Sequence, residues 1–486
     1  MSYNSINGFR GYFCRNLQPI CFLVAYFVLV VLGNLIYASP FGLRAIEAFG
    51  YPVATLKLNH IFTLGYWVLL FMPFVVTPMI VFLVKKTSVN LVECFAKKIP
   101  EMTKAWLIVL FSLSCIFVLS NFYKCGVFEI FQSGKDSVSS VEARFEIRER
   151  LHFGVFIVIQ AIVPYLSYVA VTNLSKKGGA FWYVFSLVSI LIASSFFVMI
   201  NMKWPVVLYY VGVVLTIFVH TEKYAYTKAV VGGLIVIATY LLISTVVFRL
   251  APEPMDNSVS TASAIHEKAH IDQHQAGSQE AKPPKLIVTE IVPKAIQPGG
   301  TNLAVSAERA AVVSEAAISA TPMLMMHLLS RMSIVVPYYY QEFTDHPSAC
   351  GGILAQARPG PVCRPSTYIY NKLFVSSNDQ FIGLGTSPAA VHITGYAVGG
   401  WTVAIFALLC ASVILGVLSC IPVNASSTVS AFGIVGALAG YHFSQIPGEG
   451  VIFYEHGLFW PFLLMAGYTC AVWLFNSKTM AAESAL

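Results

Sequence analysis

Charged residues are scarce in this chain. Asp, Glu, Lys and Arg make up only 11% of its 486 residues, whereas hydrophobic residues make up 57%. The mean hydropathy is +0.71. This composition argues against a soluble catalytic domain and is typical of a polytopic membrane protein.

Several familiar motifs are also absent. The sequence contains no P-loop, no dinucleotide-binding fingerprint and no G-x-S-x-G nucleophile elbow. Gly383 and Gly385 in FIGLGTSP do not follow a strand–turn–helix pattern, so they do not indicate a nucleotide site. The net charge of +7 is divided among short loops and therefore gives no sign of nucleic-acid binding.

Long apolar runs are what the chain has instead. Each is close to the roughly 20 residues that cross the hydrocarbon core of a bilayer, and in lipid such a run must be helical to satisfy its backbone. The sequence therefore predicts an all-α polytopic membrane protein with about ten transmembrane helices. The predicted spans are 20–38, 60–84, 104–120, 153–172, 180–200, 204–220, 228–249, 396–420, 425–443 and 457–476.

Basic residues fall in every second connection, which predicts that both termini are cytoplasmic. The connection at 121–152 and the long polar segment at 250–395 then lie outside the cytoplasm. Arg10 and Arg15 before the first span fit a retained anchor better than a cleaved signal peptide. The basic residues of the other connections that are predicted to be cytoplasmic are Lys85, Lys86, Lys97, Lys98, Lys104, Lys176, Lys177, Lys223 and Lys228.

The segment 250–395 divides the chain into a membrane domain at 1–249, a large outer loop, and a second membrane domain at 396–486. Residues 251–300 are rich in Pro, Ser, Ala, Gln and Glu, which predicts a flexible linker. Residues 301–395 are expected to be ordered. They include amphipathic helices at 303–319 and 322–340, with Tyr338, Tyr339 and Tyr340 at the membrane interface.

Two cysteines, Cys350 and Cys363, bracket the turn-rich stretch CGGILAQARPGPVC in this outer loop. An oxidising compartment favours a disulfide bond between them, although two unpaired thiols in a tucked loop remain the alternative.

A zinc-like pattern occurs in the linker, where His266, Glu267 and His270 spell H-E-x-x-H and His274 continues the spacing. On a packed helix, this arrangement chelates zinc and positions a general base. Here it lacks a surrounding core and a third ligand at protease spacing. A solvated polar stretch or adventitious metal binding is the favoured interpretation, and we expect no catalytic metal.

Cationic side chains provide the candidate anion ligands. Lys203 lies between two spans and is either an interfacial side chain or a phosphate ligand. Arg331, with His327 on the same helix face, is a candidate for bidentate phosphate binding, the alternative being a lipid headgroup contact. Arg358 and Arg364 flank the Pro-rich turn and either bind an anionic or sugar ligand or support the loop.

Carboxylates provide the candidate base. Glu449 lies in the short outer connection before the last span, where an ionisable residue in so apolar a chain is a functional candidate. It could take a proton from an attacking sugar hydroxyl, or it could compensate a helix N-terminus. His392, at the start of the eighth span, is a weaker candidate for the same cavity.

Four stretches give the chain a resemblance to Wzy-type oligosaccharide repeat-unit polymerases, which include O-antigen and enterobacterial common antigen polymerases. They are FVMINMKWPVVLYYVGVVL with Lys203, LLSRMSIVVPYYYQEF with Arg331, DQFIGLGTSPAAVHITGYAVGGW, and IPGEGVIFYEHGLF with Glu449. The third resembles the segment where the outer loop of this family re-enters the membrane. The linker at 251–300 departs from the family, as does Lys203 where the family often has Arg.

The resemblance implies glycosyl transfer without metal, nucleotide or other cofactor, at the periplasmic face of the bacterial inner membrane. Undecaprenyl-diphosphate-linked glycans would be donor and acceptor, with Arg331 and Glu449 as catalytic residues. Apart from the bilayer, a chain-length regulator is a further candidate partner. The alternatives are an O-antigen ligase, another polyprenyl-dependent glycosyltransferase, or a transporter of lipid-linked sugar. Against a transporter, the chain lacks an internal repeat and its spans hold few ionisable residues.

Overall fold

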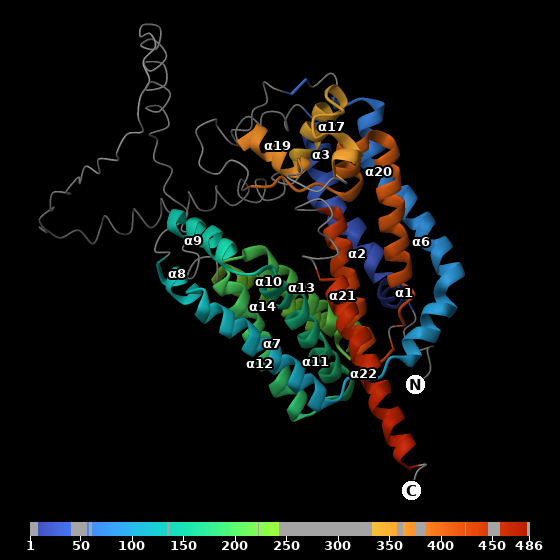
Figure 1. The fold of residues 1–486 in the computed structure, drawn as a ribbon. Coiled ribbons are helices and arrows are strands. Elements are labelled where there is room, and N and C mark those ends of the chain that lie inside the picture. Colours follow the sequence, from blue (N-terminus) through green and yellow to red (C-terminus); the bar gives the residue numbers. More distant parts are fainter. Residues whose placement is uncertain are drawn as a thin grey trace, which may run out of the picture. The chain divides into compact units, whose positions relative to one another are not determined.

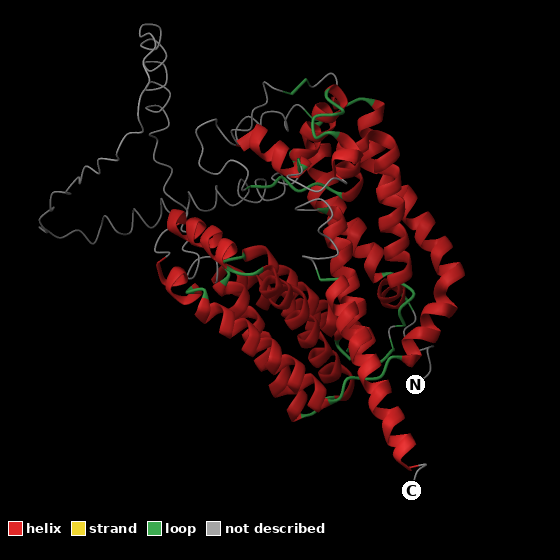
Figure 2. Cartoon of the chain, viewed as in Figure 1, coloured by secondary structure: helices red, strands yellow, loops and turns green. Residues whose placement is uncertain are grey.

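The computed structural model describes residues 8–39, 56–57, 61–133, 137–221, 223–242, 333–356, 363–374, 385–422, 424–445 and 457–483. The chain divides into two compact units. One comprises Met1–Arg249 and Met325–Leu486, and the other, Leu250–Leu324, lies wholly outside the described residues. The described part consists of helices and the loops that connect them (Figure 2).

Every apolar run that the sequence predicts as a span coincides with a helix (Figure 1). In the described part of the chain, six of these are long and apolar enough to cross a membrane. The protein is therefore an all-α membrane protein, and the number of ten crossings stays a prediction. The helices are α2 (Leu17–Tyr26), η2 (Phe27–Val31), α3 (Leu32–Tyr37), α6 (Leu64–Lys98), α7 (Lys104–Lys124), α10 (Phe153–Ile157), η4 (Val158–Ile162), α11 (Val163–Lys177), α12 (Ala180–Met199), α13 (Lys203–His220), α14 (Ala225–Leu242), α20 (Val391–Leu418), α21 (Ser427–Ser444) and α22 (Phe459–Glu483).

One helix is longer than the sequence predicts. We expected Lys85, Lys86, Lys97 and Lys98 in a loop, but α6 continues without interruption to Lys98. The prediction was wrong because residues 86–98 contain no glycine or proline to end the helix, and Leu91, Glu93 and Ala96 among them favour it. The Nζ of Lys85 donates to the Arg15 carbonyl at 2.8 Å, so Lys85 lies beside the C-terminal end of α1 (Phe9–Arg15).

The helix α21 lies at the centre of the packing and touches α2, α11, α13, α20 and α22. It is rich in Ser, Ala and Gly, and nearly all of its side chains are buried. A Cβ atom added at Gly440 would lie 2.5 Å from the Gln18 carbonyl oxygen of α2, so the two backbones approach closely. Small residues allow such close packing between membrane helices.

Polar contacts at the helix ends fall into two separate sets. In one set, Lys177 pairs with Glu101 at 2.7 Å, and Ser427 donates to the same carboxylate at 2.8 Å. Arg10 joins this set by donating to the Phe218 carbonyl at 2.9 Å. These residues belong to connections that the charge pattern assigns to the cytoplasm. Their grouping agrees with helices that alternate in direction, whereas the compartment on each side stays a prediction.

The second set of contacts involves short helices, of which the described residues between α14 and α20 form three. We call them the loop helices: α17 (Val335–Asp345), α18 (Gly352–Gln356) and α19 (Pro365–Phe374). Figure 1 shows α17 and α19 near α3 and α20, and all three loop helices contact α20. Thr63, which caps the start of α6, lies 3.1 Å from the Tyr340 hydroxyl. The loop helices therefore pack on the end of the bundle where α6 begins.

The three tyrosines of α17 are buried within the protein, with Tyr339 completely inaccessible. We expected Tyr338, Tyr339 and Tyr340 at a membrane interface, and that prediction was wrong. An aromatic run suits both environments, and here α17 packs against α20, where Tyr340 stacks on Tyr396 with ring centroids 5.5 Å apart.

A reversal of direction divides α20. Gly399 and Gly400 have non-helical backbone angles, and Gly400 has a φ of 65°. A Cβ atom at Gly395 would lie 2.8 Å from the Val403 carbonyl oxygen and 3.1 Å from the Ala404 Cα. In a straight helix, residues eight apart would lie about 12 Å apart along the axis. Residues 391–398 therefore fold back on residues 401–404 as a helical hairpin, and only the second limb continues as a span.

Candidate functional site

Few of the predicted site residues have described side chains. Arg331, Glu449, Arg358 and His327 lie outside the described residues, as does the H-E-x-x-H stretch that begins at His266. The backbone of Lys203 is described, but its side chain is not. The side chains of His392, Arg364, Cys350 and Cys363 are described, and they locate the candidate site at the loop helices and the first limb of α20.

Lys203 is the first residue of α13. It follows a short turn after α12 in which Asn201 adopts a left-handed φ of 53°. The other end of α13 belongs to the set of connections that contains Arg10, so Lys203 begins the helix at the opposite end. This is the side that the charge pattern assigns to the outside of the cytoplasm.

His392 is completely buried on the first limb of α20. Its Nε2 lies 3.2 Å from the hydroxyl of Tyr26, and that hydroxyl donates to the Leu70 carbonyl at 2.9 Å. The neighbouring Leu69 carbonyl also accepts from His392, and it is the carbonyl that Pro73, which has no amide hydrogen, leaves unbonded within α6. Because the Tyr26 proton is directed to Leu70, the His392 Nε2 is assigned as the protonated nitrogen that donates to Tyr26.

A second buried polar group lies nearer the loop helices. Asn34 donates through Nδ2 to the Ser333 carbonyl at 3.0 Å and accepts a hydrogen bond from the Tyr66 hydroxyl. The Tyr37 hydroxyl lies 3.3 Å from the Ser333 hydroxyl. Buried polar side chains within a membrane segment are costly and are often functional. This group was not predicted from the sequence, although an Asn within the first apolar run was the available signal.

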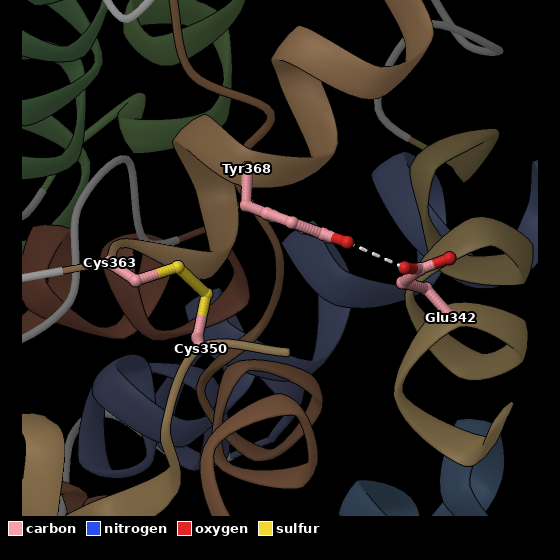
Figure 3. Close-up of a disulfide and its surroundings, with 4 residues drawn as sticks. All are labelled: Glu342, Cys350, Cys363 and Tyr368. Atoms are coloured by element: carbon pink, nitrogen blue, oxygen red, sulfur yellow. Dashed lines mark hydrogen bonds between the residues drawn. A yellow bond between two sulfur atoms is a disulfide. The ribbon is translucent and has the colours of Figure 1, made fainter. Parts of the chain in front are cut away.

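The loop helices are joined by a disulfide bond between Cys350 and Cys363, shown in Figure 3. It links the residues just before α18 to the residues just before α19. Arg364 follows directly, and its carbonyl accepts the amide of Tyr368 at 2.9 Å, so Arg364 precedes the first turn of α19. The Arg364 side chain is exposed. The bond and the α19 backbone together hold this arginine at the surface of the loop helices.

Glu342 of α17 is a buried acid among the described residues. It was not predicted from the sequence as a site residue. Its carboxylate accepts a hydrogen bond from the Tyr368 hydroxyl at 2.7 Å (Figure 3) and forms an ion pair with Lys372. Both partners come from α19, so this network fastens α19 to α17. A lone acid within the aromatic run YYYQEF was the signal in the sequence.

The pKa of Glu342 reflects two opposing effects. Burial acts to raise it, but hydrogen bonds from Lys372 and Tyr368 and the positive charge nearby outweigh burial and hold the pKa below its usual value. Burial and the hydrogen bond to Glu342 raise the pKa of Tyr368 to about 12. At neutral pH the acid is therefore ionised and the phenol is protonated.

We expect the attachment of α19 to weaken in acid. Because the folded-state pKa of Glu342 is below its unfolded value of about 4.3, its contribution to stability is present above that pH and is lost as pH falls through the folded-state pKa. Amide exchange of α17 and α19 should accelerate as the pH is lowered through this range. Glu342→Gln should remove this response, whereas Glu146→Gln, in the exposed pair with Arg150, should leave it intact. An identical acid response in Glu342→Gln would contradict the assignment.

The described residues hold no group of three or more His, Cys, Asp or Glu side chains that could bind a metal ion. They contain two separate polar groups: His392 with the Tyr26 hydroxyl, and the Glu342 carboxylate with Tyr368 and Lys372 of α19. These groups are suited to hydrogen bonding with hydroxyl-rich or anionic ligands.

Comparisons with models of protein families, with curated proteins and with solved structures found no match. The description of the chain therefore rests on its own sequence and structure. It is a helical membrane protein in which a disulfide-bonded group of loop helices packs on one end of the bundle.

Proposed function

We propose that this chain polymerises undecaprenyl-diphosphate-linked oligosaccharide repeat units by glycosyl transfer at the periplasmic face of the bacterial inner membrane. The observation that carries the proposal is the packing of the disulfide-bonded loop helices on the bundle end where α6 begins. An enzyme for lipid-linked glycans needs a membrane domain for the lipid tails and an ordered segment outside it for the sugars.

The disulfide bond supports the periplasmic location. Such bonds persist in oxidising compartments and are rare in the cytoplasm. With the loop helices in the periplasm and ten alternating spans, both termini lie in the cytoplasm. Lys203 then lies on the periplasmic side, at the start of α13.

The proposed reaction joins an acceptor hydroxyl to the anomeric carbon of the donor glycan. The bond from that carbon to the diphosphate oxygen breaks, and its electron pair leaves with the diphosphate. Arg331 and Lys203 stabilise the developing negative charge, and Glu449 takes the proton from the attacking hydroxyl. His327, Arg358, Arg364 and His392 are proposed to bind substrate.

The position of Arg331 in the chain fits this role. Ser333, two residues later, is buried and fixed to Asn34 of α3 through its carbonyl. The chain is therefore attached to the bundle directly after the arginine, at the same end where the loop helices pack. An arginine can hold a diphosphate through two parallel hydrogen bonds.

Deletion of the gene tests the proposal. We expect the surface polysaccharide to collapse from a ladder of chain lengths to a single-repeat band, and plasmid-borne wild type to restore the ladder. Full-length polymer that accumulates on the lipid carrier would instead indicate a ligase. An unchanged ladder in the deletion strain would refute polymerisation.

Arg331→Ala should fail to restore the ladder in that strain while reaching normal expression in the membrane. Arg148→Ala is the matched control, because Arg148 is an exposed arginine of α9 (Ser137–Arg150), in another connection that is predicted to be periplasmic. It should restore the ladder fully. A full ladder with Arg331→Ala would remove Arg331 from the mechanism.

A further inference from the structure

The helix α6 is longer than one membrane crossing requires. Its first part, residues 64–84, contains no charged side chain. At about 1.5 Å per residue, this part is long enough to cross roughly 30 Å of hydrocarbon. Charged side chains begin at Lys85, and the helix continues to Lys98. Residues 85–98, which we call the α6 extension, therefore add about 20 Å of helix beyond one crossing.

The α6 extension stays against the helix bundle. At its start, Lys85 is bonded to the Arg15 carbonyl at the end of α1. Shortly after its end, the Met102 amide donates to the Thr428 hydroxyl of α21 at 2.8 Å. Figure 1 shows that α6 bows outward and returns toward the bundle at its C-terminal end. The extension thus lies at the end of the bundle that is predicted to be cytoplasmic.

One side of the extension is exposed and combines lysines with large apolar side chains. Lys86, Lys97 and Lys98 are exposed, and so are Leu91 and Phe95, each with 60% of its surface accessible. Residues 91, 95 and 98 are spaced to share one face of the helix. On that face, the Lys98 Nζ lies 6.0 Å from the centre of the Phe95 ring.

The positive charge of the extension is not neutralised by the protein. None of its three exposed lysines forms an ion pair within the described part of the chain. Glu93, the single acid of the extension, is half-buried. Glu101, the next acid along the chain, is already paired with Lys177 at 2.7 Å. The exposed side of the extension therefore carries an excess of positive charge beside an apolar row.

This combination of side chains complements an anionic lipid surface. An interfacial helix places its apolar side chains at the boundary of the acyl chains, while its lysines extend toward the phosphates of the headgroups. Clusters of lysines directly after a span, on its cytoplasmic side, attract anionic lipids. Such a surface lies next to the extension, because the apolar part of α6 that crosses the bilayer ends directly before Lys85.

We propose that the α6 extension lies in the headgroup layer of the cytoplasmic leaflet and binds anionic phospholipids. Lys86, Lys97 and Lys98 contact the phosphates, and Leu91 and Phe95 insert at the boundary of the acyl chains. This inference goes beyond the proposed function and does not rest on it. Lipid binding at the extension is the same whether the chain is a polymerase, a ligase or a transporter.

Lipid titration of the purified full-length chain in detergent tests the proposal. Native mass spectrometry counts the bound molecules of phosphatidylglycerol, which is anionic, or phosphatidylcholine, which has no net charge. We expect wild type to bind phosphatidylglycerol more tightly. The triple variant Lys86→Gln, Lys97→Gln, Lys98→Gln should weaken that binding about fivefold for each lysine removed, and should leave phosphatidylcholine binding unchanged. Arginine at the same three positions keeps the charge and should bind like wild type.

The matched control removes three exposed lysines from other connections, in the triple variant Lys124→Gln, Lys223→Gln, Lys228→Gln. It should bind phosphatidylglycerol like wild type. Equal affinity of wild type for the two lipids would overturn the proposal. An equal loss of affinity in the two glutamine variants would also overturn it, because the attraction would then belong to the net charge and not to the extension.

Amide exchange locates the lipid contact within the chain. In nanodiscs of phosphatidylcholine, addition of phosphatidylglycerol should slow the exchange of residues 86–98 in wild type, and should not do so in the variant with glutamine at positions 86, 97 and 98. Protection of this segment in native membranes, combined with unchanged exchange in the nanodiscs, would show that another protein covers the extension. That result would refute lipid binding at this surface.

Discussion

Replacing Gly395 with alanine is expected to open the α20 hairpin and to cause one of the largest losses of stability of any single substitution considered. The added Cβ would lie 2.8 Å from the Val403 carbonyl oxygen and 3.1 Å from the Ala404 Cα. These are backbone atoms, which cannot move aside as a flexible side chain can. The two limbs of the hairpin must therefore separate.

Overpacking of a close contact typically costs about 1–3 kcal/mol, and a backbone neighbour places this case at the upper end. Thermal unfolding of the purified protein measures the loss. The separation would also shift His392 from Tyr26. Gly233→Ala is the matched control, because a Cβ at that helical glycine of α14 meets nothing within 4 Å.

Equal unfolding temperatures for Gly395→Ala and Gly233→Ala would show that residues 391–398 do not pack against residues 401–404. Lower stability of Gly395→Ala than of Gly233→Ala would confirm the hairpin.

Removing the disulfide bond is the second substitution with a large expected effect. Cys350 and Cys363 are 13 residues apart, and closing a loop of about 15 residues stabilises a fold by about 3 kcal/mol in the chain-entropy account. We expect the double variant Cys350→Ser, Cys363→Ser to lose protection of α18 and α19 from amide exchange and proteolysis. The network of Glu342 with Tyr368 and Lys372 would remain as the main link between α19 and α17.

Cys94→Ser serves as its control, because Cys94 is a free, exposed thiol of α6. It should leave the protection of the loop helices unchanged. Protection in the double variant that equals wild type would show that packing on α20 alone holds these helices. Labelling of Cys350 or Cys363 themselves before any reduction, located by peptide mapping, would contradict the bond itself.

The same two cysteines, in the wild-type chain, test the proposed location. Cys350 and Cys363 should become accessible to a thiol reagent only after reduction, and a reagent that cannot cross the inner membrane should then reach them in intact spheroplasts. Labelling that requires permeabilised membranes would place the loop helices in the cytoplasm and would refute the proposed topology.

Much of the helical framework was predictable from the sequence. A backbone in lipid must satisfy its own hydrogen bonds, so an apolar run of about 20 residues is a helix whatever its neighbours are. This is why α7 and α12 coincide with predicted runs. The pairing of Cys350 with Cys363 was also a prediction, and the structure contains that bond.

The candidate site was less predictable. His392 was selected as a weak candidate, but Tyr26 and Asn34 lie in the first apolar run and contact residues more than 290 positions away. Glu342 was missed because its partners, Tyr368 and Lys372, belong to another helix. A buried polar side chain is recognised by its surroundings, and a single sequence does not contain them.

The sequence by itself determined that the long apolar runs are helical and that two cysteines of the outer loop could pair, since these are local features. Only the tertiary structure decided that α20 reverses at Gly399 and Gly400, that the α17 tyrosines face protein, and that the first turn of α20 begins inside the bundle. Two glycines within an apolar run are compatible with a straight span. The contact of Gly395 with Val403 selects the reversed direction, because only glycine allows the two backbones to approach so closely.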